Sequence, residues 1–198
     1  MKYYQDVTLL RDARIDLYDF WQKLYQQIHI ALAENKNGDS TSSIGVSFPE
    51  YNAAEFSLGI KLRLFAEGVD ALEKFKCEQW LSRLIDYVHI GKIMPVPETV
   101  QGYACFRQVK TKGSNEKLAR RRAKRLGINY ADALAYFKDT NTRKTSENKH
   151  SKLPYIHMHS ETNGHQFRLF IDLKIEDQEK PGTFSCYGLS NASTVPMF

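Results

Sequence analysis

The stretch from Leu17 to Leu32, LYDFWQKLYQQIHIAL, decides the first half of the fold. Stepping about 100° per residue from Leu17, six further apolar side chains fall within about 60° of it. These residues are Phe20, Trp21, Leu24, Ile28, Ala31 and Leu32. The pattern predicts a long amphipathic helix, from about Asp12 to Glu34, that buries one face.

Short alternating segments surround this helix and predict strands. In chain order they are Tyr3–Leu10, Ile44–Pro49, Leu58–Phe65 and His89–Pro95, and Val69–Val88 predicts helix in one or two pieces. The resulting order, βαββαβ, is that of ferredoxin-like and RRM-like domains, whose sheets often bind RNA. We therefore predict an α+β protein with a ferredoxin-like domain over residues 1–96.

The segment from Pro95 to Pro97 predicts a domain boundary, after which the second half begins. Residues 97–198 predict a second domain that carries an arginine-rich helix and strands. The predicted elements are a strand over 103–110, helices over 115–126 and 130–137, a polar stretch over 138–152, and strands over 155–158, 167–174 and 183–189.

The positive charge of the chain is concentrated in one segment. Residues 107–125 hold nine Lys or Arg and one acid, a local charge of +8. Because the whole chain carries +5, the remainder carries −3. Such a local concentration indicates a polyanionic partner more than general solubility.

The helix predicted over about 115–126, which reads EKLARRRAKRL from Glu116 to Leu126, has a cationic front and a mainly apolar back. The front consists of Lys117, Arg120, Arg121, Lys124 and Arg125, and Arg122 alone breaks the apolar back. A solvated surface would mix charges of both signs, so nucleic acid is favoured over that simpler interpretation. The back is too small to insert into a membrane surface. The cations lie on the first of two helices, which disfavours helix-turn-helix DNA binding.

Other features limit the class of protein. Three cysteines without CxxC spacing argue against disulfides and zinc and fit a reduced cytoplasm. The N-terminus lacks the apolar core of a secretory signal, and no apolar run is long enough for a membrane span. We expect a cytoplasmic protein that does not associate with membranes.

Three histidines stand out, each with a simpler interpretation. His29 lies at the edge of the predicted helix's apolar face, where a histidine is usually only solvated or locally bonded. His157 and His159 share one face of a strand, a pattern that can bind metal, but no nearby acid or cysteine completes a site. From spacing alone, neither catalysis nor metal binding is favoured.

Several strings taken together change this assessment. They are LYQQIHIAL around His29, IGVSFP at 44–49, FRLFI at 167–171, and CYGLS followed by VPMF between 186 and 198. With the arginine-rich helix between them, the chain resembles the CRISPR repeat-processing endoribonucleases of type I-F systems. The resemblance spans nearly the whole chain.

The resemblance implies a metal-independent cut, without cofactor, at the base of the repeat hairpin in precursor CRISPR RNA. It also implies that the enzyme stays on the mature guide RNA with other subunits of a type I-F surveillance complex. The family's catalytic histidine falls on His29, its catalytic serine on Ser160 and its active-site tyrosine on Tyr187. The phenylalanine that stacks beneath the terminal base pair falls on Phe167.

The chemistry fits these residue types. Without metal, the 2′-OH of the RNA can attack the adjacent phosphate in line, which leaves a 2′,3′-cyclic phosphate and a 5′-OH. An imidazole, which ordinarily titrates near pH 6.5, can take the 2′-OH proton. The hydroxyl of Ser160 can hold the 2′-OH in place.

The chain departs from the family where bases are read. The family uses an arginine and a glutamine two residues apart on the strand before the helix, and here Gln108 and Lys110 stand there, with Arg107 offset by one. We predict that RNA is bound by Arg107, Gln108, Lys110, Lys112, Lys117, Arg120, Arg121, Lys124, Arg125 and Phe167. The alternatives are an RNA-hairpin-binding subunit that does not cleave and a basic DNA-binding regulator.

Overall fold

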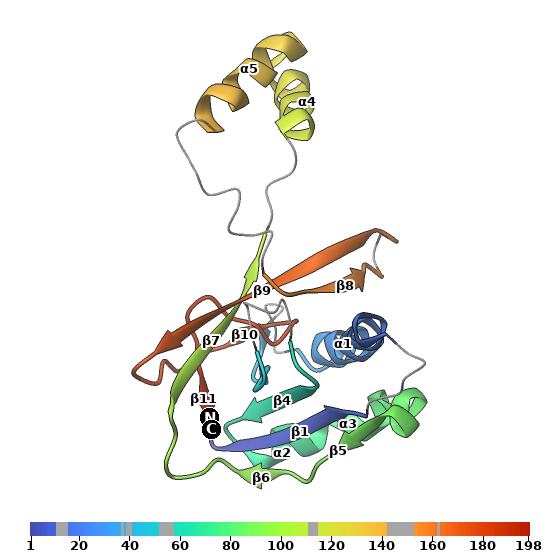
Figure 1. Ribbon diagram of the computed structural model, residues 1–198, viewed down its shortest axis with the longest axis vertical. Coiled ribbons are helices and arrows are strands. Elements are labelled where there is room, and N and C mark those ends of the chain that lie inside the picture. The colour runs from blue at the N-terminus through green and yellow to red at the C-terminus, as the bar shows by residue number, and fades with distance from the viewer. Residues whose placement is uncertain are drawn as a thin grey trace. The chain divides into compact units, whose positions relative to one another are not determined.

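The computed structural model describes residues 1–10, 16–36, 38, 41–51, 58–110, 115–141, 153–161 and 163–198 (Figure 1). These residues form two compact units. The first comprises Met1–Val109 together with Pro154–Phe198, and the second comprises Lys110–Leu153. No helix in the described part of the chain is both long and apolar enough to cross a membrane.

Helix α1 spans Leu17–Glu34. The helix begins later than the predicted start at Asp12. Asp16 is still extended, and it caps the helix by accepting a 2.7 Å hydrogen bond from the Tyr18 backbone N–H. Residues 11–15 lie outside the described residues. The predicted apolar face is buried from Phe20 to Leu32, but Leu17, in the first turn, is 39% exposed.

The first sheet is antiparallel and has the strand order β3-β4-β1-β5, with β6 pairing with β1. Its strands are β1 (Tyr3–Leu9), β3 (Gly45–Ser47), β4 (Lys61–Ala66), β5 (Val88–Ile90) and β6 (Met94–Pro95). Three short helical pieces lie between β4 and β5, where one or two were predicted: α2 (Val69–Phe75), α3 (Cys77–Trp80) and the 3-10 helix η2 (Ser82–Tyr87). Apart from two-residue strands, and with the helical pieces between β4 and β5 taken together, the chain order from β1 to β5 is βαββαβ, as predicted.

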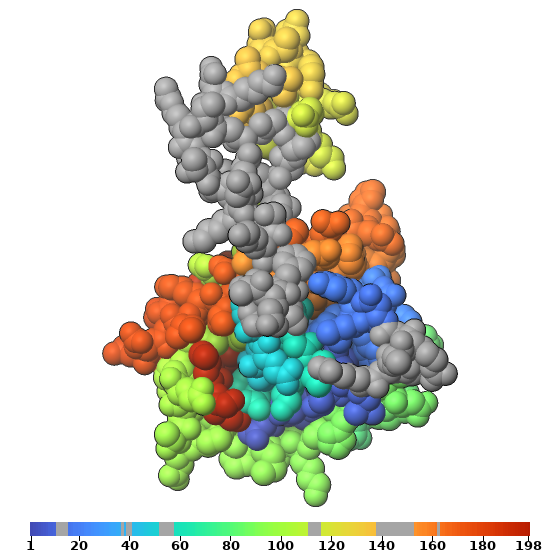
Figure 2. Space-filling model, in the orientation of Figure 1, coloured from blue at the N-terminus to red at the C-terminus, as the bar shows by residue number. Residues whose placement is uncertain are grey.

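The second sheet is also antiparallel and has the order β11-β7-β9-β8. Its strands are β7 (Gly102–Val109), β8 (Tyr155–His159), β9 (Gln166–Glu176) and β11 (Val195–Met197). Strand β11 was not predicted; it contains Pro196, which an edge strand tolerates because one side of that strand needs no ladder hydrogen bonds. Figure 2 shows this C-terminal segment, in red, at the surface of the first unit.

The strand predicted over residues 183–189 is mostly wrong. Only β10 (Phe184–Ser185) is extended, and it pairs with β2 (Thr41–Ser42). The chain then turns, because the Gly188 N–H donates to Ser185 O at 2.8 Å and Gly188 adopts a positive φ of 69°. A left-handed glycine interrupts the extended conformation that the residue pattern predicted.

The two sheets share one core. Phe48, which follows β3, packs edge-on against Phe106 of β7 with ring centroids 5.4 Å apart. Helix α1 lies against β8, and its buried residues belong to the same core cluster as those of the first sheet. The boundary expected at residues 96 and 97 therefore falls within the first compact unit.

The second unit contains α4 (Asn115–Leu126) and α5 (Tyr130–Asn141), packed against each other. Gly127 has a φ of 65° and ends α4, as predicted from the Leu126–Gly127 pair. Ala119 and Ala133 are fully buried. Helix α5 begins where predicted and continues beyond residue 137.

Candidate active site

His29 is held on α1 by the last segment of the chain. Its Nδ1 lies 2.9 Å from the backbone carbonyl oxygen of Cys186. A carbonyl can only accept, so in the neutral ring Nδ1 carries the hydrogen and Nε2 keeps its lone pair. The ring is half-buried. The arrangement presents an imidazole nitrogen that can accept a proton.

The ring of Tyr187 fixes the plane of this imidazole. The two rings are stacked, with centroids 4.1 Å apart and planes 8° apart. The ring of Phe167 on β9 packs edge-on against the same tyrosine, with ring centroids 6.5 Å apart. Burial, with a smaller contribution from Cys186, raises the pKa of Tyr187, so its hydroxyl remains protonated near neutral pH.

The turn that carries Tyr187 is anchored to α1. Tyr25, one helical turn before His29, donates its hydroxyl hydrogen to the Tyr187 carbonyl at 2.8 Å. Tyr25 is fully buried, and burial holds its pKa well above the ordinary value. A Cβ at Gly188 would lie 2.2 Å from Cγ2 of Val46, so the turn requires glycine for its close approach as well as its conformation.

Ser160 lies in the turn between β8 and β9. Its N–H donates to His165 O at 2.9 Å, and its carbonyl accepts from the Gly164 N–H at 2.8 Å. Gln26 joins this turn to α1: its Nε2 donates to His159 O at 2.9 Å, and its Oε1 accepts from the His159 N–H at 3.1 Å. Because Gln26 precedes His29 by three residues, both lie on one side of the helix.

Sequence reasoning missed two of these elements. The side chain of Gln26 carried a usable signal, since a polar residue three positions before a candidate histidine shares its helix face. The backbone carbonyl of Cys186 carried none, because every residue has a carbonyl and 157 positions separate the partners.

The other two histidines lie on β8. His157 packs edge-on against Tyr155, with ring centroids 5.2 Å apart, and the Nδ1 of His159 is 3.9 Å from Glu161 Oε1. Among the described residues, no three His, Cys, Asp or Glu side chains gather into a group that could hold a metal ion.

Comparison with known proteins gives a family that spans the chain. Residues 4–198 match the family model described as CRISPR-associated protein (Cas_Csy4). The chain belongs to this family. The CRISPR-associated endonuclease Cas6/Csy4 of Pseudomonas aeruginosa (strain UCBPP-PA14) is 32% identical over 201 residues and that of Escherichia coli (strain UTI89 / UPEC) 30%, with both chains covered completely in each case. The resemblance inferred from the sequence is confirmed.

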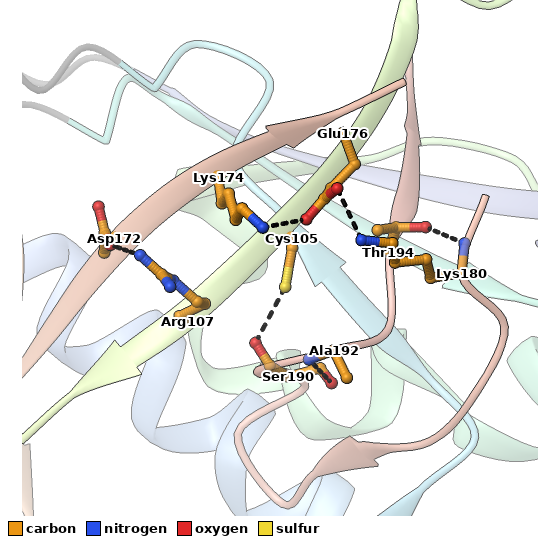
Figure 3. Close-up of polar contacts among 9 residues, drawn as sticks. All are labelled: Cys105, Arg107, Asp172, Lys174, Glu176, Lys180, Ser190, Ala192 and Thr194. Carbon is orange, nitrogen blue, oxygen red and sulfur yellow. Dashed lines mark hydrogen bonds and ion pairs between the residues drawn. The ribbon is translucent and has the colours of Figure 1, made fainter. Parts of the chain in front are cut away.

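In this Cas_Csy4 family member, Arg107 has an acidic partner on the neighbouring strand. Arg107 of β7 stands opposite Asp172 of β9, and their side chains form an ion pair (Figure 3). The same face carries Lys174 and Lys180, which both pair with Glu176 and lower its pKa to about 2. Arg107 thus belongs to a face with charges of both signs, and its role in RNA binding stays a prediction.

Gln108 and Lys110 do not share a strand. Gln108 is half-buried on β7 and points to the opposite face from Arg107, because neighbouring residues on a strand alternate. Strand β7 ends at Val109, so Lys110 follows it and is exposed. Lys112 lies outside the described residues.

The predicted cationic front of α4 is exposed along the helix. Its members are Lys117, Arg120, Arg121, Lys124 and Arg125. Arg122, the exception on the helix wheel, is half-buried, with its guanidinium carbon 3.8 Å from the Tyr136 ring centroid of α5. Its contribution to packing α5 accounts for a cation on the otherwise apolar side.

Proposed function

We propose that the chain is a metal-independent endoribonuclease that binds the repeat hairpin of precursor CRISPR RNA and cuts at its 3′ base. After cleavage it stays on the mature guide RNA within a type I-F surveillance complex. Its family and the endonuclease names of its relatives support this proposal. The observation that carries it is the Nδ1 contact of His29, which leaves Nε2 able to accept a proton.

The reaction is an internal transfer at one phosphate. The 2′-OH of the nucleotide before the cut gives its proton to Nε2 of His29 while its oxygen attacks the adjacent phosphorus in line. The P–O5′ bond breaks and the leaving 5′ oxygen takes a proton from water, so the products carry a 2′,3′-cyclic phosphate and a 5′-OH. A metal-activated water is not required because the nucleophile belongs to the RNA.

The neighbouring side chains position the reactants. Tyr187 stacks on the imidazole and keeps its plane aligned with the attacking oxygen. Ser160 orients the 2′-OH, and its turn is held to α1 by Gln26. Phe167, edge-on to Tyr187, supports the terminal base pair of the hairpin by stacking.

Affinity comes mainly from α4. A narrow cationic helix suits the deep major groove of A-form RNA, where arginines reach phosphates on both walls. This phosphate-binding affinity comes from five exposed cations of the helix: Lys117, Arg120, Arg121, Lys124 and Arg125. Arg107, Gln108, Lys110 and Lys112 complete the RNA-contacting set.

We also assign a ferredoxin-like arrangement to the elements that support His29. The support is the antiparallel order β3-β4-β1-β5 combined with the βαββαβ chain order. In this arrangement α1 covers the sheet and places His29 at the margin of its buried face.

The experiment is a cleavage assay with purified protein and the CRISPR repeat RNA of its own host in excess EDTA. The proposal expects one cut at the 3′ base of the hairpin, with cyclic phosphate and 5′-OH ends identified by mass spectrometry. Binding without any cut would indicate a non-cleaving RNA-binding subunit. Dependence on added Mg²⁺ would overturn the mechanism.

A further inference from the structure

We propose that a polar pocket beside the turn of residues 185–189, which carries Tyr187, binds the base of the first nucleotide 3′ of the cut. This inference rests on the proposed function, because it assumes cleavage at the foot of the hairpin. The pocket has a volume of about 310 Å³, within the range of small-molecule binding pockets. Its lining residues all belong to the first compact unit.

The pocket adjoins the segment that orients His29. Ser185 and Leu189 line it, and the same two residues close the turn of residues 185–189 through a 2.8 Å hydrogen bond from Ser185 N–H to Leu189 O. Tyr187 lies between them in the chain. The pocket is therefore lined by residues two positions away in the chain from Tyr187, whose ring stacks on His29.

The lining suits a nucleobase better than a phosphate. Its polar members carry hydroxyl or amide groups, and none of the described lining residues is charged: Thr41, Gln108, Thr183, Ser185, Ser190 and Asn191. Phe184 and Leu189 complete the lining and are buried. Neutral donors and acceptors with apolar neighbours match the polar edge and flat face of a base.

Several of these groups have hydrogen-bonding capacity left. Ser185 Oγ accepts from the Tyr187 N–H at 3.3 Å, and Ser190 Oγ accepts from the Ser193 N–H at 2.9 Å. Each hydroxyl hydrogen has no acceptor within the residues that the structure describes. The side-chain amide of Gln108 also has no hydrogen-bond partner among the described residues. A base edge offers complementary groups to all three.

This assignment gives Gln108 a different role from a groove contact. Gln108 faces the pocket, and so reads an unpaired base beside the scissile phosphate. The first nucleotide 3′ of the cut is unpaired and carries the 5′ oxygen that leaves. Holding its base fixes the direction of the P–O5′ bond and keeps it in line with the attacking 2′-OH.

The test measures single-turnover cleavage of repeat RNAs that differ at one position. An abasic residue at the first nucleotide 3′ of the cut is expected to slow wild-type cleavage about tenfold. Gln108→Ala is expected to slow cleavage of the intact RNA and to reduce the penalty of the abasic residue. Gln101→Ala, a neutral exposed change just before β7, is the matched control and retains the full penalty. Equal rates for intact and abasic RNA with the wild-type protein would overturn the proposal.

A second readout does not depend on cleavage. Repeat RNA with 2′-H before the cut and 4-thiouridine after it is photocrosslinked to the protein, and the attachment site is mapped by mass spectrometry. A crosslink within residues 183–191 is expected. Crosslinking there without cleavage of the matching all-ribo RNA would overturn the proposed enzyme and keep the pocket. Cleavage with the crosslink elsewhere would overturn the pocket alone.

Discussion

The His29 site and the cationic front of α4 are built in opposite ways. His29 is fixed by a hydrogen bond to Cys186 O and by a stacked ring, and both contacts come from the end of the chain. The cations of α4 are exposed to solvent, and the packing of that helix includes the buried Ala119 and the Arg122 guanidinium over Tyr136. Chemistry needs a geometry that many contacts determine, whereas phosphate binding needs charge density on one surface.

The largest expected effect is on the fixed site. His29→Ala should lower the single-turnover cleavage rate about 10²- to 10⁴-fold, because it removes the proton acceptor. Hairpin affinity should stay within a few-fold, since the phosphate-binding cations are unchanged. His89→Ala, an exposed change on β5, is the control. Full-rate cleavage by the His29 variant would remove this residue from the mechanism.

The second effect separates the ring of Tyr187 from its hydroxyl. Tyr187→Ala removes the surface that stacks on His29 and should slow cleavage roughly 10- to 100-fold. Tyr187→Phe keeps the stack and should cleave within a few-fold of wild type. Rate constants at saturating protein measure both. If the Tyr187→Phe variant cleaves as slowly as the Tyr187→Ala variant, the Tyr187 hydroxyl takes part in the reaction itself.

The sequence could predict those parts of both regions that depend on periodicity. The α1 face, the cationic front of α4 and the glycine that ends α4 all follow from local patterns. The resemblance selected His29 and Tyr187 from among many candidates. The Cys186 carbonyl could not be predicted, because backbone groups have no residue-specific signal.

Other misses also have local physical reasons. The residue pattern over 183–189 predicts a strand, but in the structure Gly188 has a left-handed conformation and packs closely against Val46. Arg122 breaks the apolar side of the predicted helix, and the structure explains it because its guanidinium packs over the Tyr136 ring of α5. In both cases the decisive partner comes from another element, so no pattern within the segment could reveal it.

The third effect concerns the charged helix alone. The double substitution Arg120→Ala with Lys124→Ala should flatten the slope of log K against log salt by about 0.7 to 0.9 per residue. Affinity for any stable hairpin should fall, while the cleavage rate at saturating protein should hardly change. Fluorescence anisotropy at several salt concentrations measures the slope. Arg83→Ala with Lys92→Ala removes the same charge from exposed positions of the first unit. An unchanged slope in the α4 variant would refute its role in phosphate binding.

The smallest effect is expected at Gln26. Gln26→Ala removes the hydrogen bonds that join α1 to the turn of Ser160, so the cleavage rate should fall a few-fold with little change in affinity. Each lost bond should also reduce the free energy of unfolding by about 0.5 to 1.5 kcal/mol. Denaturant titration and single-turnover kinetics measure the two quantities. A loss of affinity with an unchanged rate would place Gln26 in RNA binding instead.

The most direct test of the central claim changes one atom of the RNA. Replacing 2′-OH by 2′-H only at the nucleotide before the cut removes the nucleophile and leaves every phosphate in place. Binding and cleavage of this RNA are compared with those of the all-ribo hairpin in EDTA. The account predicts equal affinity and no cleavage at that position. Cleavage of the deoxy RNA would contradict it, because an activated water would then be the nucleophile.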